Sequence, residues 1–150
     1  MFAFLVVALL VTLGVAIVGW FRPVPAKPPP AATYSNQQVA DAKAKVCAAY
    51  EKVHLAVLAN TGRSGGSDPT ATLAVAANAR LALYDGGEYL VKTLTQEPAT
   101  PADLAGAIRA LASAYQELAV DYMAEATDPE INSSFQAVET TGSKVSGMCK

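Results

Sequence analysis

Few residues in this sequence have side chains suited to covalent, acid–base or metal chemistry. There are two cysteines, Cys47 and Cys149, and one histidine, His54. Cys47 and His54 lie in one predicted helix, where seven positions separate them by about 10 Å along the axis. That distance is too long for a nucleophile–base pair or a shared metal ion, so His54 is expected on a flank or surface of its helix. Phosphate-loop, dinucleotide, zinc-protease and CxxC patterns are also absent from the sequence. The sequence therefore predicts no enzyme activity, no metal site and no cofactor.

Acidic residues offer the next candidate for chemistry. Glu117, Asp121 and Glu125 follow one another at intervals of four, so they share one face of a predicted helix. A divalent-ion site is conceivable there, but a solvated acidic face is the preferred interpretation. The chain has 11 basic and 13 acidic residues, and Arg22 and Lys27 precede Ser35, so the remainder carries a net charge of about −4. Nucleic-acid binding is excluded, because it would require a basic patch.

One arginine falls beside a predicted apolar stripe. Arg80 is a possible buried charge, and a buried arginine needs a carboxylate partner. The alternative is an arginine that packs its stem on the core while its guanidinium reaches water. The candidate partners are Asp85, Glu117 and Asp121.

A short segment after Arg80 is the best candidate for a recognition spot. Two tyrosines and two acids surround a pair of glycines, whose exposed backbone would be open to a partner. Adjacent glycines inside a helix cost about 1 kcal/mol each relative to alanine, so they mark a kink, a break or a close approach by a neighbouring helix. The segment consists of Tyr84, Asp85, Gly86, Gly87, Glu88 and Tyr89.

The two cysteines are predicted to form a disulfide. In an up-down-up-down bundle, the start of the first helix and the end of the fourth lie at the same end, which allows Cys47 to meet Cys149. Closing a loop of about 100 residues would stabilise the fold by about 4–5 kcal/mol. The alternative is two unpaired cysteines in the core. A disulfide favours an oxidising compartment.

The first residues predict a transmembrane anchor. Met1–Phe21 contains no charged side chain, and about twenty apolar residues in a helix match the thickness of a bilayer core. A cleaved signal peptide fits less well, because the run is too long, no basic residues precede it and no suitable cleavage site follows promptly. The basic residues Arg22 and Lys27 lie after the span, which by charge alone would put the rest of the chain in the cytoplasm. Because almost nothing precedes the span for comparison, and because the cysteines favour oxidation, we expect the C-terminal domain outside.

A proline-rich stalk follows the anchor. Residues 22–34 hold five of the nine prolines, and proline favours the extended polyproline II conformation. At about 3.1 Å per residue, the proline-rich part reaches about 35 Å. We interpret it as a semi-rigid spacer rather than as a PxxP ligand.

Residues 35–150 show helical periodicity throughout. Ser35 with Gln38 predicts a capping box, and Asp68-Pro69, Thr100-Pro101 and Asp128-Pro129 mark three further helix starts. The predicted fold is therefore all-α, with an N-terminal transmembrane helix and a small up-down four-helix bundle. The four apolar stripes are Val39, Val46, Tyr50, Val53 and Val57; Leu73, Ala77, Tyr84, Val91 and Leu94; Leu104, Ile108, Leu111, Tyr115, Leu118 and Tyr122; and Ile131, Phe135, Val138, Val145 and Cys149.

These features together resemble the mycobacterial alanine- and proline-rich single-pass membrane proteins. The resemblance rests on the span, the proline stalk, the segments VCAAY, DPTA, AANAR and GGEYL, and the terminal Cys-Lys, and it covers most of the chain. That family has no established activity, so the resemblance implies topology rather than mechanism: one span in the plasma membrane and a helical domain in the cell envelope. Family members usually carry a polar or basic cytoplasmic tail before the span. This sequence has none, and a start placed too far downstream would explain the weak charge signal.

Two functions are favoured at this point, and a third, less favoured one is an enzyme or metal protein, which convergent carboxylates with shifted pKa values in a cleft would support. The first is a non-enzymatic, membrane-anchored module that binds another envelope protein, and a large exposed apolar patch would favour it. The second is binding of a lipid or another apolar ligand between the helices, and an apolar cavity would favour it. Small-residue packing argues against such a cavity.

Overall fold

The computed structural model describes residues 4, 6, 11, 12 and 33–150. The chain divides into two units, residues 1–33 and Tyr34–Lys150. The predicted anchor and stalk therefore lie almost wholly outside the described residues. The described anchor positions are helical, and Phe4, Val6 and Val11 are exposed. Within the described part of the chain, no helix is both long enough and apolar enough to cross a membrane.

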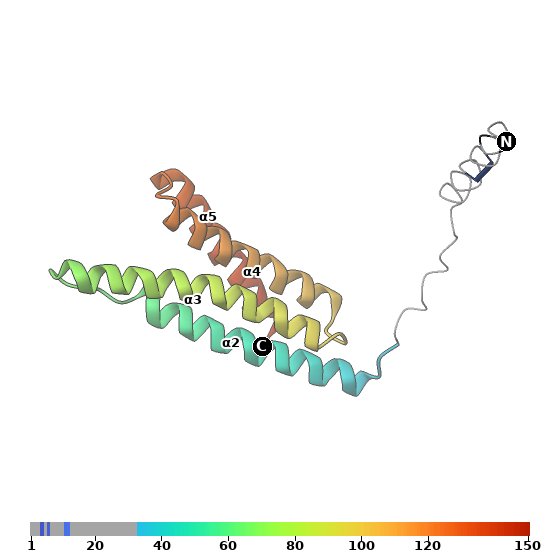
Figure 1. Ribbon diagram of the computed structural model, residues 1–150. Helices are drawn as coiled ribbons and strands as arrows, with labels where there is room; N and C mark the ends of the chain where they lie inside the picture. Colours follow the sequence, from blue (N-terminus) through green and yellow to red (C-terminus); the bar gives the residue numbers. More distant parts are fainter. Residues whose placement is uncertain (1–3, 5, 7–10, 13–32) are drawn as a thin grey trace. The chain divides into compact units, whose positions relative to one another are not determined.

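The second unit contains four helices. They are α2 (Asn36–Thr61), α3 (Pro69–Gln96), α4 (Ala102–Met123) and α5 (Asp128–Met148). Extensive contacts join α2 to α3, α3 to α4 and α4 to α5, and short connections make successive helices antiparallel (Figure 1). The predicted all-helical, bundle-like packing is confirmed for this unit.

Two of the predicted helix starts are confirmed in detail. The Ser35 hydroxyl accepts from the backbone N–H of Gln38, whose side chain accepts from the Ser35 N–H, so the capping box is complete. The Asp68 carboxylate accepts from the Thr70 N–H, with Pro69 as the first residue of α3. Local sequence determines both ends, because each cap satisfies N–H groups that a helix leaves unpaired.

The start of α4 differs from the prediction in its cap, whereas the start of α5 is confirmed at Asp128, with Pro129 in its first turn. The Thr100 hydroxyl donates to the Glu97 carbonyl instead of capping α4. The N-cap of α5 is Thr127, and the Glu130 carboxylate accepts from both its backbone N–H and its hydroxyl. These bonds lower the pKa of Glu130 below its ordinary value, because they favour the ionised carboxylate.

The core centres on α4. Leu104, Ile108, Leu111, Tyr115 and Leu118 are all buried, which matches the predicted stripe, whereas Tyr122 at its end is exposed. This helix packs against both α3 and α5. It buries more residues than α2, α3 or α5.

The predicted stripe of α3 is wrong except for Leu94. Leu73, Ala77, Tyr84 and Val91 are exposed, with Leu73 the most open at 66%. The helix buries another set instead, which consists of Leu83, Gly86, Gly87, Leu90 and Leu94.

Gly86 and Gly87 explain why α3 buries a different face from the predicted one. A Cβ added to Gly86 would lie 2.8 Å from Val53 Cγ1 on α2, and one added to Gly87 would lie 2.8 Å from the Ala112 carbonyl oxygen on α4. The helix therefore turns its glycine side inward, where two neighbours approach more closely than any side chain allows. Of the three interpretations of the glycine pair, close approach is confirmed, because α3 continues unbroken through it.

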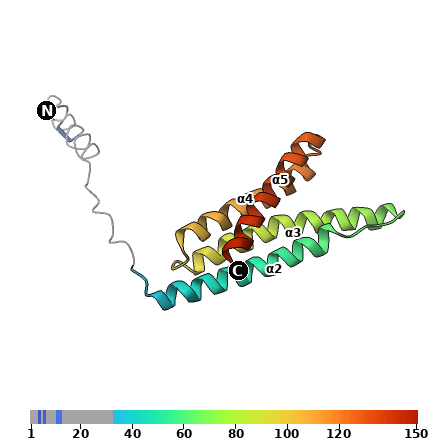
Figure 2. The ribbon, with the colours of Figure 1, turned by 180° about the vertical axis from the view of Figure 1, so that it is seen from behind.

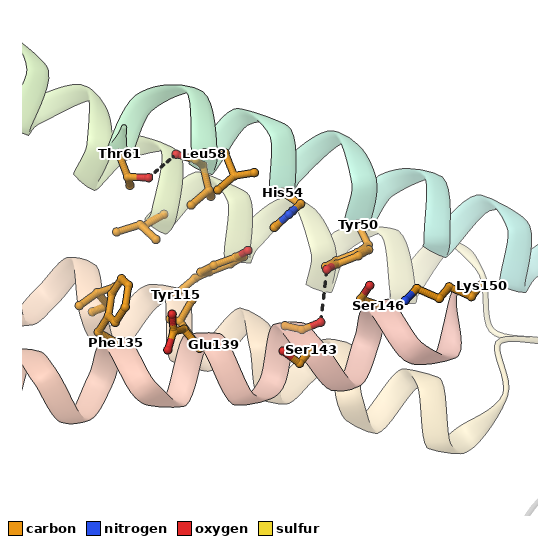
Figure 3. Close-up of a pocket in the computed structure, with 15 residues that line it drawn as sticks. Tyr50, His54, Leu58, Thr61, Tyr115, Phe135, Glu139, Ser143, Ser146 and Lys150 are labelled. Carbon is orange, nitrogen blue, oxygen red and sulfur yellow. Dashed lines mark hydrogen bonds between the residues drawn. The ribbon is translucent and has the colours of Figure 1, made fainter. Parts of the chain in front are cut away.

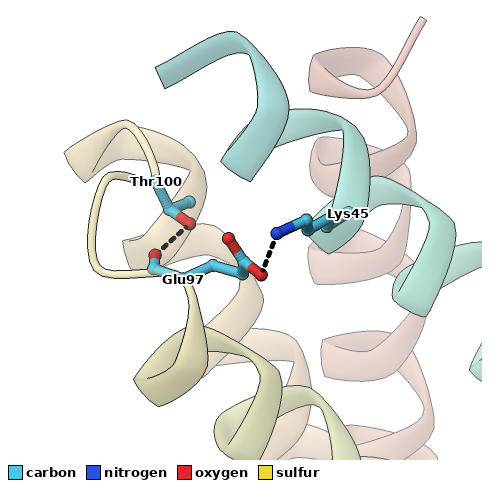
Figure 4. A network of polar contacts seen from close by, with 3 residues as sticks. All are labelled: Lys45, Glu97 and Thr100. Carbon is cyan, nitrogen blue, oxygen red and sulfur yellow. Dashed lines mark hydrogen bonds and ion pairs between the residues drawn. The ribbon is translucent and has the colours of Figure 1, made fainter. Parts of the chain in front are cut away.

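One end of the bundle, which we call the closed end, is fastened by three contacts. Cys47 and Cys149 form the predicted disulfide, with their Cα atoms 5.5 Å apart. The Tyr50 hydroxyl donates to the Gly142 carbonyl at 3.3 Å. Lys45 pairs with Glu97 at 2.8 Å (Figure 4), and this hydrogen-bonded pair raises the pKa of Lys45. The C-terminus accordingly lies over α2 in both ribbon views (Figures 1 and 2).

The opposite end, which we call the open end, is packed more loosely. No residue of α3 from 69 to 82 is buried, and in α5 only Ser134 is buried before Val145. The tip of the α2–α3 hairpin diverges from the tip of the α4–α5 hairpin (Figure 1). The α2–α3 and α4–α5 hairpins are therefore held together mainly at the closed end.

Candidate functional site

A groove of about 780 Å³ runs between α2 and α5. It forms because extensive packing joins only consecutive helices among the described four, which leaves the seam between the first and last of them partly unfilled. Across it, Leu58 of α2 and Phe135 of α5 are each about half exposed. The remaining apolar wall consists of Val57, Leu83, Leu118 and Val138.

The floor of this groove carries an unpaired hydroxyl. Tyr115 is only 2% exposed, and its hydroxyl makes no hydrogen bond within the described residues. No fully buried side-chain oxygen or nitrogen there lacks a partner, so the hydroxyl must reach the open space of the groove. Burial raises the pKa of Tyr115 to about 12, with a smaller contribution from Tyr50. The group is therefore a neutral donor throughout the physiological range.

His54 of α2 also lines the groove (Figure 3). Its ring stacks on Tyr50, with the centroids 5.6 Å apart. Neither ring nitrogen is hydrogen-bonded to another described residue. The Tyr50 hydroxyl, in contrast, is already engaged with Gly142. The groove thus combines apolar walls, the unpaired Tyr115 hydroxyl and the His54 imidazole with a polar rim that includes Ser143, Glu139 and Lys150.

The predicted recognition spot does not form one surface. Gly86 and Gly87 are buried, so their backbone is not presented to solvent, which corrects that part of the prediction. Because successive residues of a helix point in different directions, the other four side chains divide. Glu88 accepts from Gln116 of α4, whereas Asp85 and Tyr89 line a shallow pocket toward α2, where Lys52 lies 5.5 Å from the Tyr89 ring centroid.

Arg80 is half-buried, and its partner is not a carboxylate. Its Nη2 donates to the Tyr122 carbonyl at 3.2 Å. This carbonyl belongs to the last turn of α4, where a cation is favoured by the helix dipole and by unpaired carbonyls. Arg80 is therefore neither fully buried nor hydrogen-bonded to one of the expected carboxylates.

The residues first examined for chemistry do not assemble into a reactive centre in the described part of the chain. Both cysteines are consumed by the disulfide, and Asp121 accepts from the Ser134 hydroxyl. No group of three or more His, Cys, Asp and Glu side chains among these residues is placed to hold a metal ion.

A second candidate surface, which we call the apolar face, lies along α3 and α4. Arg80 contacts Tyr122, and Glu88 contacts Gln116. This register brings Tyr84 alongside the stretch that contains Val120. Towards the open end, the exposed side chains remain large and apolar. The face consists of Leu73, Tyr84 and Val91 of α3 with Val120 and Met123 of α4, and Leu81 borders it on the side toward α2.

Sequence reasoning missed the groove. Tyr50 and His54 are four apart and so share a helix face, which was an available signal. Their pairing with Tyr115 and Phe135, however, depends on the α2–α5 seam, which no local pattern encodes. Comparison with protein families, with curated proteins and with solved structures finds no match to this chain.

Proposed function

We propose that this chain is a single-pass plasma-membrane protein whose extracytoplasmic helical domain is a non-enzymatic module that binds another envelope protein. The observation that carries the proposal is the apolar face of α3 and α4. Leu73 is 66% exposed and Met123 56%, and Leu81 at the border of the face is 57% exposed. Exposed apolar side chains that gather on one surface mark interaction sites.

The composition of the face indicates the partner's chemistry. Residues 69–84 contain one charged side chain, Arg80, and its guanidinium is engaged with Tyr122. The surface therefore offers mainly apolar area, and the two charged groups at its seam, Arg80 and Glu88, are already hydrogen-bonded within the bundle. A complementary partner presents an apolar stripe, such as the exposed face of an amphipathic helix.

Membrane attachment and sidedness rest on other features. Met1–Phe21 has the length and apolarity of a span, and the proline-rich residues 22–34 supply reach. The disulfide supports an oxidising location. The resemblance to the mycobacterial alanine- and proline-rich membrane proteins agrees with this topology.

Site-specific photocrosslinking tests the interaction. A photoreactive residue replaces Leu81 in the full-length chain in its own membrane, and the matched control replaces Gln136, an exposed residue of α5. We expect an adduct with a second protein from position 81 and none from position 136. The adduct should disappear when Leu73→Glu and Met123→Glu are added. Adducts that contain only a second copy of this chain, or equal adducts from both positions, would contradict the proposal.

Sidedness has its own test. Arg63 lies exposed in the α2–α3 connection, inside the loop that the disulfide closes. Trypsin added outside intact spheroplasts should cut there, and the two pieces should separate only after reduction. Protection of Arg63 until the membrane is permeabilised would overturn the extracytoplasmic location.

A second candidate function is binding of a lipid or another apolar ligand within the bundle. The groove between α2 and α5 favours it, because its volume of about 780 Å³ falls within the usual range of ligand sites. Native mass spectrometry of the protein extracted in mild detergent tests it. A retained lipid-sized adduct is expected, and a bare mass under conditions that preserve the fold would argue against it.

A further inference from the structure

The Tyr115 hydroxyl is unexplained by the fold alone. The side chain is 98% buried on the floor of the groove, and phenylalanine would fill the same volume without the expense of desolvating a hydroxyl. Buried polar groups in native proteins nearly always have a partner. Within the described residues this hydroxyl has none, and it faces the groove (Figure 3). Its partner therefore comes from outside the bundle, either as water or as a ligand group that displaces water from the groove.

The surroundings of this hydroxyl define the partner group. The proton of a neutral phenol needs an acceptor, so the incoming atom is a hydrogen-bond acceptor. The ionisable side chains along the groove are His54, Glu139 and Lys150. Glu139 and Lys150 are exposed rather than buried beside Tyr115, and His54 carries no fixed positive charge. A buried anion without a cation beside it would be strongly disfavoured. The acceptor is accordingly neutral, as a carbonyl oxygen is.

The walls define the rest of the ligand. Leu58, Phe135 and Val138 approach the groove from α2 and α5, and Leu118 lies deeper on α4. Leu58 and Phe135 are large apolar side chains that water now contacts, and an acyl chain would remove that apolar area from water.

We propose that the groove binds a neutral acyl ester lipid, with the ester carbonyl accepting from Tyr115 and the acyl chain packed against Leu58, Leu118 and Phe135. His54 lines the same groove and offers an imidazole to a glycerol hydroxyl of the same lipid. This site lies on the α2–α5 seam, opposite the α3–α4 seam that carries the apolar face. The lipid site is therefore independent of the proposed protein partner.

An equilibrium binding assay tests the assignment. Radiolabelled 1-palmitoylglycerol is titrated onto the full-length chain in detergent micelles, and unlabelled palmitic acid competes at neutral pH. Tyr115→Phe removes only the hydroxyl, so affinity should fall about three- to tenfold, while the melting temperature of the ligand-free protein stays the same or rises. The matched control is Tyr84→Phe on the apolar face, which should bind as the unaltered chain does.

A second variant tests the contribution of the groove itself, apart from that of the Tyr115 hydroxyl. Ser143 lines the groove and is exposed, so Ser143→Trp should fill the groove from its rim without disturbing the core, and abolish binding. Equal affinity for Tyr115→Phe and the unaltered chain would overturn the proposal. So would tighter binding of palmitic acid than of the ester, or no ester binding at all. Crosslinking from Leu81 should persist in Tyr115→Phe, which keeps the two proposals distinguishable.

Discussion

The closed and open ends of the bundle are built from the same four helices but differ in how much they bury. Around Val46, Leu94 and Ile108, side chains are packed to less than a tenth of their free exposure. At the open end, Leu58, Leu73 and Phe135 remain about half exposed or more. Stability therefore concentrates where the chain is fastened, and apolar area available to partners concentrates where it is not. A small domain can separate these two tasks along the length of its helices.

Removing the disulfide at the closed end should cause the largest loss of stability. Reduction, or Cys47→Ala with Cys149→Ala, releases a loop whose ends are 102 residues apart, and the stability loss should be about 4–5 kcal/mol. Thermal unfolding with and without reductant measures it. An unchanged melting temperature after verified reduction would show that packing alone holds the closed end.

The second largest effect should be the difference in stability loss between two leucine substitutions, one at a buried position and one at the open end. Leu111 is fully buried, whereas Leu58 is 54% exposed. Leu111→Ala should lower the free energy of unfolding by about 2–5 kcal/mol, and Leu58→Ala by less than about 1 kcal/mol. Denaturant titration of both variants provides the measurement. Comparable losses would mean that the open end is packed as tightly as the closed one.

Alanine substitutions at two glycines, Gly87 of α3 and Gly106 of α4, should change stability in opposite directions. Gly87→Ala would bring a Cβ against the Ala112 carbonyl, which belongs to rigid helix backbone, and should destabilise by about 1–3 kcal/mol. Gly106 has no atom within 4 Å of an added Cβ, so Gly106→Ala should instead stabilise α4 by about 1 kcal/mol. Opposite signs in thermal unfolding are expected, and a stabilising Gly87→Ala would refute the close approach.

The smallest effect should come from the tip of the open end. Hydrogen bonds from Thr127 lower the pKa of Glu130, so this cap contributes stability above the ordinary glutamate pKa and loses it as pH falls through the lower folded value. Glu130→Gln should flatten that part of the acid unfolding curve, with Glu139→Gln as the control. An identical pH profile for both variants would show that the cap adds nothing.

The sequence was sufficient where structure is local. Ser35 and Asp68 cap their helices as expected. The long-range contact between Cys47 and Cys149 was predictable because an up-down topology allows these two residues to meet. The buried face of α3 was not predictable from hydrophobicity, since Gly86 and Gly87 place that face inward through the shape of neighbouring helices. The groove was not predictable either. Whether Tyr50 of α2 meets Tyr115 of α4 across an unfilled seam depends on the packing of all four helices together.

The disulfide also determines how the domain carries load. A force applied through Tyr34 enters α2 at Asn36 and reaches Cys47 after about three helical turns. Beyond that residue the chain is a covalent ring that closes at Cys149. Tension between Tyr34 and Lys150 therefore passes through the disulfide and can unravel only the first turns of α2. The apolar face and most of the groove lie on the ring, so a load between these two residues bypasses both.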